Sequence, residues 1–281
     1  MLSYLHSFHA GNRADLHKHG GLLALLAAMR KNPEPLTYIE THSGRGRYDL
    51  HAAQAKKTGE FLTGAATLWQ AKPPPRGLAP LVQAIQAENE DRDDLRYYPG
   101  SPMLAAKALR QRDRLELCEL HPKEAPALRQ ALARFRRAKI RHVDGLEWVK
   151  SAPGLQGRRA LILIDPSYEQ SAEYEALGAW LPEMAARLPS TSRYPFEVRF
   201  LPDGRHVPML EALKTNLKAP TMLGSVTWSA NAKADRGLIG SALVVIRAPD
   251  GLAGGLARVQ RDLLKLLKAP EKGARVERLT G

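Results

Sequence analysis

The stretch Leu161–Gln170, LILIDPSYEQ, joins an apolar run to an abrupt polar end. Four large aliphatic residues followed directly by an acid predict a buried strand that stops at Asp165. A plain turn explains this composition on its own, because Asp and Pro both favour the start of turns. A functional interpretation therefore needs residues elsewhere in the chain that require an acid and an aromatic ring at the same place.

Strand-like and helix-like segments alternate along the chain, which is the signature of an α/β fold with a parallel sheet. We therefore expect a doubly wound sheet. A short polar loop separates the last two predicted strands, so these two can pair as an antiparallel hairpin at the sheet edge. The predicted strands are 36–40, 114–120, 138–143, 159–165, 193–200, 221–228 and 240–248, and the clearest helical periodicity lies in 14–30, 122–137, 171–187 and 252–268.

The amino-acid composition indicates a protein that binds a polyanion. The 281 residues are 44% hydrophobic and 25% charged, with 42 Lys and Arg against 29 Asp and Glu, a formal net charge of +13. Such an excess favours nucleic acid as the partner. A single cysteine, Cys118, excludes an internal disulfide. No apolar signal segment or run of membrane-spanning length is present, so we expect a cytoplasmic protein.

A helical and proline-interrupted stretch, 49–96, separates the first predicted strand from its successor. Its centre, AKPPPRG at 71–77, is a stiff break between two helix-like pieces. We interpret 49–96 as a small inserted helical subdomain, and 1–48 with 97–281 as the core domain.

Small and acidic residues follow four of the predicted strands. Glycines after the first strand let a backbone approach a ligand, and an acid after the second is placed to bind ribose hydroxyls. The third glycine of the dinucleotide fingerprint is missing. The order of these residues along the chain fits methyl transfer from S-adenosylmethionine to an amino nitrogen better than it fits hydride transfer. These residues are Gly44 and Gly46, Glu119, Asp144 with Gly145, and Asp165 with Pro166.

The same motifs resemble those of the large-subunit ribosomal RNA adenine-N6 methyltransferase J family. The likeness is convincing over residues 1–170 and thinner beyond, where only RG at 236–237 and GSALVVI at 240–246 are similar. The matching motifs are MLSYLHSFHAGNRADLHKH at the N-terminus, THSGRGRY at 41–48, TGE at 58–60, LRYYPGSP at 95–102, ELHP at 119–122, DG at 144–145 and LILIDPSYE at 161–169.

The resemblance implies a Rossmann-like methyltransferase sheet that acts on adenine N6 of 23S ribosomal RNA, as naked RNA or an early precursor. Methyl transfer from an already activated donor requires no metal, and we expect no membrane association and no obligate protein partner. Asp165 would hold the flipped base's amine together with the Pro166 carbonyl, while Tyr168 would stack on the base and Tyr4 would lie near it. The S-adenosylmethionine site would comprise Lys18, His19, His42, Gly44, Ser101, Glu119, Asp144, Gly145 and Asp165.

Basic residues outside these motifs are candidates for RNA contact. A run at 129–141 predicts either a phosphate-binding strip or a solvated helix face. Histidines near the N-terminus lack the acid or cysteine spacing of a metal site, and a segment folded over a nucleotide explains them equally well. The RNA candidates are Arg134, Arg136 and Arg137 in the run, Lys56 and Lys57 in the insertion, and Lys233 and Arg236 in the last loop.

Three positions depart from the family pattern. Ser167 replaces the second proline of the usual D-P-P-Y motif, Glu40 replaces an Asp, and RYPFEVRF at 193–200 replaces a tryptophan-containing strand start. Two alternatives therefore remain beside the RNA methyltransferase. One is a DNA adenine-N6 methyltransferase, and the other is an RNA-binding protein of the same fold with weakened catalysis.

Overall fold

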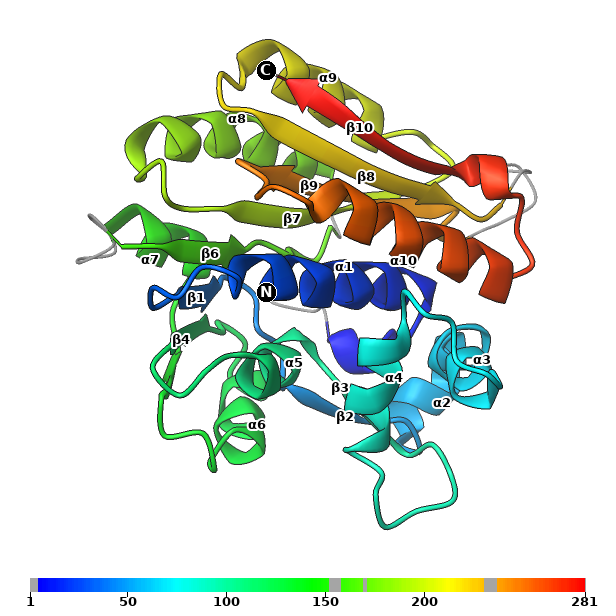
Figure 1. The fold of residues 1–281 in the computed structure, drawn as a ribbon. Coiled ribbons are helices and arrows are strands. Elements are labelled where there is room, and N and C mark those ends of the chain that lie inside the picture. The colour runs from blue at the N-terminus through cyan, green and yellow to red at the C-terminus, as the bar shows by residue number, and fades with distance from the viewer. Residues whose placement is uncertain (1–4, 152–157, 169–170, 230–236, 281) are drawn as a thin grey trace.

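The computed structural model describes residues 5–151, 158–168, 171–229 and 237–280 (Figure 1). Its strands form a mixed sheet with a small separate ribbon. The strands are Thr37–Glu40 (β1), Arg47–Asp49 (β2), Tyr97–Pro99 (β3), Arg114–Cys118 (β4), Ala138–Arg141 (β5), Ala160–Leu163 (β6), Tyr194–Phe200 (β7), Thr221–Thr227 (β8), Gly240–Ile246 (β9) and Ala274–Thr280 (β10).

The central sheet has a parallel half and an antiparallel half. The parallel half runs in the order β5-β4-β1-β6, and the antiparallel half in the order β7-β9-β8-β10. Parallel bridges from Leu161 to Arg193 and from Ile164 to Phe196 join β6 to β7. The chain therefore builds outward from β1 through β4 to β5 and then crosses back to β6 on the other side. This reversal creates a crevice at the carboxyl ends of β1 and β6, where open α/β sheets bind ligands.

All seven strands predicted from the sequence are confirmed, and so is the antiparallel pairing of β8 with β9. The predicted place of this pair at the sheet edge is wrong. β9 lies between β7 and β8, and β10 covers the outer side of β8. The strand β10, ARVERLT, alternates charged and apolar residues, as edge strands that resist further pairing do.

Helices cover both faces of the sheet. In Figure 1, α1 and α10 lie side by side across one face, while α8 and α9 pack together on the opposite side. The α-helices are Arg13–Met29 (α1), Ala53–Thr58 (α2), Ala65–Gln70 (α3), Ala79–Gln86 (α4), Ser101–Ala108 (α5), Glu124–Ala131 (α6), Gly145–Ser151 (α7), Ser171–Arg187 (α8), His206–Asn216 (α9) and Leu252–Leu266 (α10); 3₁₀ turns occupy His6–Phe8, Glu60–Thr63 and Glu271–Gly273.

Three of the four clearest helix predictions are confirmed within about two residues, but α6 is much shorter than the predicted 122–137. Turns replace the helix after Ala131: the Phe135 N–H donates to the Leu132 carbonyl, and the Ala138 N–H to the Phe135 carbonyl. The chain must reverse there to enter β5. The arginine run therefore lies mainly in a turn and not on a helix face.

Alternating residues of β6 divide the core between the two faces. Leu161 and Leu163 pack with α1 and α10, whereas Ile162 and Ile164 pack with α8 and α9. All four are fully buried. This period-two pattern with both faces apolar explains why the sequence of β6 is a continuous aliphatic run.

The stretch 49–96 contains α2, α3 and α4. The strands β2 and β3 lie at its two ends and pair with each other in antiparallel orientation. Leu68 of α3 and Leu81 of α4 share one hydrophobic cluster with Leu16 of α1 and Val259 of α10. The segment is therefore helical, as expected, and packs against the helices on that face of the sheet. Its division from the core as a separate subdomain stays a prediction.

Candidate active site

A cavity of about 430 Å³ opens at the carboxyl ends of β1, β4 and β6, and we call it the main cavity. Its size lies within the range of roughly 300–1,000 Å³ that is usual for small-molecule sites. Ten of the residues predicted to bind the cofactor or the reacting amine line it together. They are Lys18, His19, His42, Gly44, Ser101, Glu119, Asp144, Gly145, Asp165 and Pro166.

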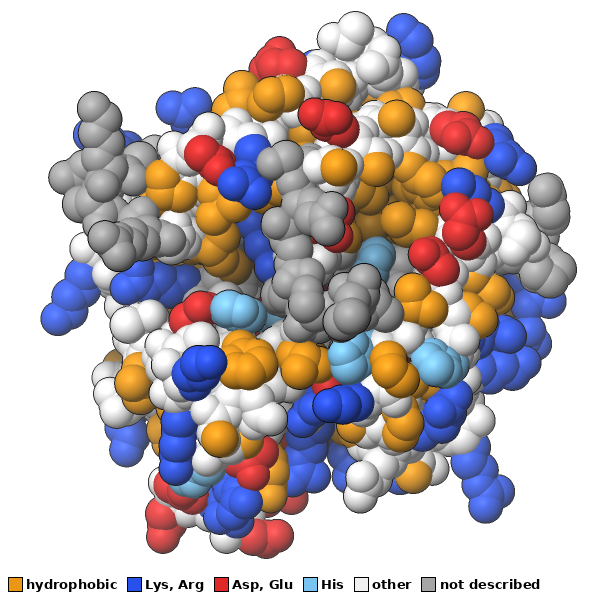
Figure 2. Space-filling model, turned by 180° about the vertical axis from the view of Figure 1, so that it is seen from behind, with side chains coloured by type: hydrophobic (Ala, Val, Ile, Leu, Met, Phe, Trp, Pro, Cys, Tyr) orange, Lys and Arg blue, Asp and Glu red, His pale blue; other side chains and the backbone are white. Residues whose placement is uncertain are grey.

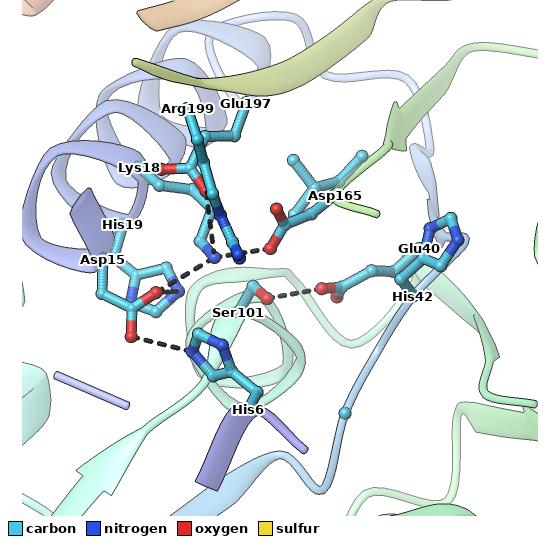
Figure 3. A network of polar contacts seen from close by, with 12 residues as sticks. His6, Asp15, Lys18, His19, Glu40, His42, Ser101, Asp165, Glu197 and Arg199 are labelled. Atoms are coloured by element: carbon cyan, nitrogen blue, oxygen red, sulfur yellow. Dashed lines mark hydrogen bonds and ion pairs between the residues drawn. The ribbon is translucent and has the colours of Figure 1, made fainter. Parts of the chain in front are cut away.

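Lys18 lines this cavity and lies at the centre of a cluster of charged side chains (Figure 3). The Nζ of Lys18 lies 2.6 Å from Asp165 Oδ2, 3.0 Å from Asp15 Oδ1 and 3.8 Å from Glu197 Oε2. Only 2% of the Lys18 side chain is exposed. One ammonium group thus holds three carboxyl groups from α1, the end of β6 and β7.

These contacts set the ionisation of Asp165. Burial alone would raise its pKa, but the ammonium of Lys18 and the guanidinium of Arg199 outweigh burial and lower the pKa to about 2. Burial raises the pKa of Glu197, and Lys18, which lies farther from Glu197 than from Asp165, does not offset this effect. Asp165 is therefore the ionised carboxylate of the pair at neutral pH.

One carboxylate oxygen of Asp165 has no hydrogen-bond donor among the described residues. Its Oδ2 accepts a hydrogen bond from Lys18, whereas its Oδ1 is buried and accepts none from the described part of the chain. A buried carboxylate oxygen without a donor is costly. An N–H group brought into the cavity would satisfy it.

Two histidines of α1 remain neutral inside the protein. Burial lowers the pKa of both His17 and His19 to about 3. His17 Nδ1 contacts Ser241 Oγ at 2.8 Å, and His19 Nδ1 contacts Tyr98 Oη at 2.8 Å. Within the described residues, no group of three His, Cys, Asp or Glu side chains has the arrangement of a metal site.

Three members of the charged cluster around Lys18 were not predicted: Asp15, Glu197 and Arg199, of which Arg199 also lines the main cavity. Asp15, Lys18 and His19 recur at helical spacing, which places them on one face of α1. Glu197 and Arg199 alternate within an otherwise apolar strand, which places both on one face of β7. Both patterns are readable in the sequence, so these residues were detectable.

The glycine turn after β1 is held by the predicted ribose acid. Gly44 has φ +60°, a conformation that other residues rarely adopt, and a Cβ there would lie 2.3 Å from Tyr48 Oη, so the turn favours glycine. Glu119 Oε2 accepts the Gly44 N–H at 2.6 Å, and Oε1 accepts the His121 N–H at 2.7 Å. Each carboxylate oxygen retains a second acceptor position for a ribose hydroxyl.

Beneath this turn, the acid at the end of β1 is fully buried. The hydroxyl of Ser101, in the first turn of α5, donates to Glu40 Oε1, and Tyr38 Oη donates to Glu40 Oε2 at 2.9 Å. Burial dominates and raises the pKa of Glu40 to about 8. Ser101 therefore joins the cavity lining to a carboxyl group that is largely protonated near neutral pH.

The Asp144–Gly145 pair begins α7 beside the cavity. Asp144 Oδ1 accepts the Glu147 N–H at 3.0 Å, so Asp144 caps the helix as well as lining the cavity. A Cβ on Gly145 would lie 2.1 Å from the Thr41 carbonyl oxygen, so glycine permits α7 to approach β1. His42 Nδ1 contacts the Thr41 hydroxyl at 2.8 Å, and burial lowers the pKa of His42.

The loop after Asp165 is held by two neighbours. The Ser167 hydroxyl donates to Glu173 Oε1 at 2.9 Å, and Arg199 donates to the Ser167 carbonyl at 2.9 Å. Tyr168 is 4% exposed, lies 4.4 Å from the Tyr174 ring between centroids, and donates its hydroxyl to the Glu197 carbonyl. Tyr168 lines a second cavity and not the main one. Its predicted stacking on the target base stays a prediction.

The RNA-contact candidates fall into three groups. Arg134 and Arg136 are exposed, as are Lys56 and Lys57 at the end of α2. Arg137 is a correction: its guanidinium faces inward and donates to the carbonyls of Ala106 and Leu109, where it caps the end of α5. Tyr4, Lys233 and Arg236 lie outside the described residues.

The face opposite that of Figure 1 is rich in histidine and basic side chains. Figure 2 shows histidines gathered near the middle of this face, with Lys and Arg side chains around them. None of the helices in the described ranges is both long and apolar enough to cross a bilayer.

The strand order β5-β4-β1-β6-β7-β9-β8 and the cavity at the carboxyl ends define a Rossmann-like α/β fold of the methyltransferase class. The chain belongs to the family described as ribosomal RNA large subunit methyltransferase D, RlmJ, whose model matches residues 33–280. The match extends well beyond residue 170, where the resemblance in sequence motifs becomes thin.

Two curated relatives carry the name ribosomal RNA large subunit methyltransferase J. The Escherichia coli K12 protein is 41% identical over 183 residues, and the Haemophilus influenzae protein is 41% identical over 175 residues. The aligned parts span 65% and 62% of this chain, and the same shares of the two relatives' own lengths.

Solved structures share the fold. A Legionella pneumophila protein superposes with a TM-score of 0.83 and 28% identity, over 96% of this chain and 97% of its own. A probable spermidine synthase from Corynebacterium glutamicum gives a TM-score of 0.50 at 11% identity, over 86% of this chain and 70% of its own. The second likeness concerns the fold alone.

Proposed function

We propose that the protein transfers a methyl group from S-adenosylmethionine to the N6 amine of an adenine in 23S ribosomal RNA. The observation that carries the proposal is the buried Asp165 carboxylate with its unpartnered Oδ1, in the same cavity as the predicted cofactor residues. Family membership and the names of the curated relatives support ribosomal RNA as the substrate. A bacterial cytoplasm and naked or early precursor RNA belong to this proposal.

The residues present fit the cofactor. Glu119 would accept the ribose hydroxyls, Gly44 would leave room for the backbone to approach, and Asp144 with Gly145 would border the adenine. Lys18, His19, His42 and Ser101 would complete the site. When bound, S-adenosylmethionine supplies a methyl group on a positively charged sulfur, which is an activated leaving group.

Asp165 would position the amine. The lone pair of an exocyclic adenine amine is delocalised into the ring, so the amine is a weak nucleophile and gains from a fixed orientation. Asp165 Oδ1 would accept one N–H, and the Pro166 carbonyl would accept the other. On gaining the methyl group the amine nitrogen would become cationic and acidic, and Asp165 or solvent would take its proton.

Mass spectrometry of ribosomal RNA tests the proposal in cells. RNA from cells that lack the gene should lose one N6-methyladenine that RNA from the parent strain contains. Purified protein should restore the mark in deproteinised 23S RNA from the deletion strain, with DNA of the same sequence as the control. Methylation of the DNA alone would favour the DNA enzyme, and cofactor binding without any methyl transfer would favour the weakened RNA-binding protein.

A further inference from the structure

A second cavity, of about 500 Å³, lies beside the main one, and we call it the side cavity. It is bounded by the start of α1, the inserted segment and the ends of β7 and β8. Among the described residues predicted to bind substrate, Tyr168 lines this cavity and not the main one. Its lining includes His9, Arg13, Glu60, Tyr168, Arg199 and Trp228.

Arg13 is the cation that this cavity leaves without a counter-charge. Its side chain is partly buried, its Nε is fully buried without a hydrogen-bond partner, and none of the described residues forms an ion pair with it. Nearby, Glu60 is already bound by His9 and Asn12, at 2.8 and 3.0 Å. A partly buried guanidinium with no anion favours an anionic ligand, and its planar donor fork matches a phosphate.

Two aromatic residues, Trp228 and Tyr168, also line the side cavity. Trp228 donates its indole N–H to the Leu238 carbonyl at 2.8 Å, and Tyr168 donates its hydroxyl to the Glu197 carbonyl. Their polar ends are thus bound to backbone, and both residues line the cavity. Aromatic rings beside an arginine are the usual elements of a site for one nucleotide of a single strand.

The position of the side cavity identifies which nucleotide it fits. Asp165 and Pro166 line only the main cavity, whereas Arg199 lines both and separates them. A base in the side cavity, beside Tyr168, is therefore not the base whose amine meets Asp165, so this inference moves the stacking predicted for Tyr168 from the target base to its neighbour. We propose that the side cavity binds the nucleotide next to the target adenosine, with Arg13 on the phosphate that joins the two; this inference rests on the proposed function.

A chemical double-mutant cycle tests this contact. The probe is a five-nucleotide single-stranded RNA with adenosine at its centre, in its native form and with an uncharged methylphosphonate in place of either phosphate beside the adenosine. Binding to the full-length protein is measured by fluorescence anisotropy over a series of salt concentrations. Arg13→Gln is compared with Arg261→Gln, an exposed arginine of α10 outside both cavities.

Arg13→Gln should weaken binding of the native RNA by about tenfold, the equivalent of one charge-assisted hydrogen bond, and lower the salt slope by about 0.7. Arg261→Gln should leave both unchanged. One of the two methylphosphonates should weaken binding to the native protein but have no effect in the Arg13→Gln protein. This loss of additivity assigns Arg13 to that phosphate.

Additive effects of the variant and both methylphosphonates would overturn the inference, as would an Arg13→Gln protein that binds the RNA as the native protein does. Thermal unfolding of each variant checks that the fold is intact, and Arg13→Lys keeps the charge if glutamine destabilises the protein. Because binding is measured without turnover, the expected coupling in a protein that methylates no RNA would refute the proposed function and not the site.

Discussion

Lys18 and Asp165, 147 positions apart in the sequence, meet at 2.6 Å inside the protein. The contact uses Oδ2 and leaves Oδ1 buried without a donor from the described residues. The ion pair thus keeps the carboxylate charged and occupies only one of its two oxygens. A stable charge and a free acceptor are the two properties that holding an amine requires.

Asp165→Asn removes the charge and retains the size of the side chain. The amide presents a donor or a weaker acceptor to the adenine amine, so we expect methyl transfer to fall by at least about two decades. Cofactor affinity should change little, and single-turnover methylation with calorimetric binding separates the two quantities. Near-normal turnover in the asparagine variant would remove Asp165 from the mechanism.

Lys18→Met leaves three carboxyl groups in the core without their shared cation. Breaking a buried pair by removing one partner typically costs roughly 3–5 kcal/mol, because the remaining charge stays desolvated. We expect a loss of this size in the free energy of urea unfolding. Lys265→Met is the matched control, since Lys265 is 62% exposed and its surface ion pair is worth about 1 kcal/mol or less. Equal losses in the two variants would contradict the role of Lys18.

The sequence predicts the strands of this fold well because aliphatic runs such as 160–164 report burial on both faces directly. It predicts β10 poorly, because the charged residues Arg275, Glu277 and Arg278 mimic a solvated tail. Helix α9 is missed for a related reason: Pro208 interrupts the apparent periodicity, yet in the first turn of a helix a proline is tolerated.

The sequence predicts which residues line the candidate site, but it does not predict how their side chains contact one another. Residues at the carboxyl ends of β1, β4 and β6 converge by topology, so Glu119 and Asp165 could be assigned to one cavity in advance. No local pattern states that Lys18 would pair with Asp165, because that distance depends on how α1 packs across the sheet. Arg137 failed for the opposite reason: its neighbours suggest a solvated run, while packing turns it inward to α5.

Glu40→Gln should change how stability depends on pH. The folded-state pKa of Glu40 is raised to about 8, so its contribution is fully present below the unfolded pKa of about 4.3 and is lost as pH rises toward 8. Glutamine does not titrate. In urea unfolding between pH 5 and 8, the variant should therefore lose stability less steeply, by up to about 1.4 kcal/mol per pH unit. Identical slopes would mean that Glu40 is ionised in the folded protein.

Arg134 and Arg136 should contribute to RNA affinity and not to stability. Both are exposed, so replacing both with glutamine should lower the salt slope of binding to 23S RNA by up to about 1.4–1.8, the equivalent of two phosphate contacts. Arg137→Gln should instead destabilise the protein, because the carbonyls at the end of α5 lose their donor. An unchanged slope in the double variant would identify Arg134 and Arg136 as a solvated surface.

Ser167→Pro should leave methylation intact or improve it. Proline would restore the rigidity of the usual motif by fixing φ near −65° and favouring extended geometry at Pro166. The substitution removes the hydroxyl that bonds to Glu173 but keeps the carbonyl that accepts from Arg199. Glu173→Gln provides the comparison, since it weakens the same contact without adding rigidity. Initial rates with saturating RNA and cofactor distinguish the two variants.

Substitutions at Tyr168, the residue after Ser167, test the same loop. Tyr168→Ala should cost roughly 1–3 kcal/mol in base engagement if the ring is a stacking platform, and Tyr168→Phe should retain it. Because the ring is buried against Tyr174, the alanine variant must be assayed well below its melting temperature. If Ser167→Pro is tolerated and Tyr168→Ala is damaging, the loop contributes to methylation through the aromatic ring of Tyr168. If proline abolishes transfer while the fold persists, the hydroxyl of Ser167 has a role of its own; if alanine is silent, no base stacks on Tyr168.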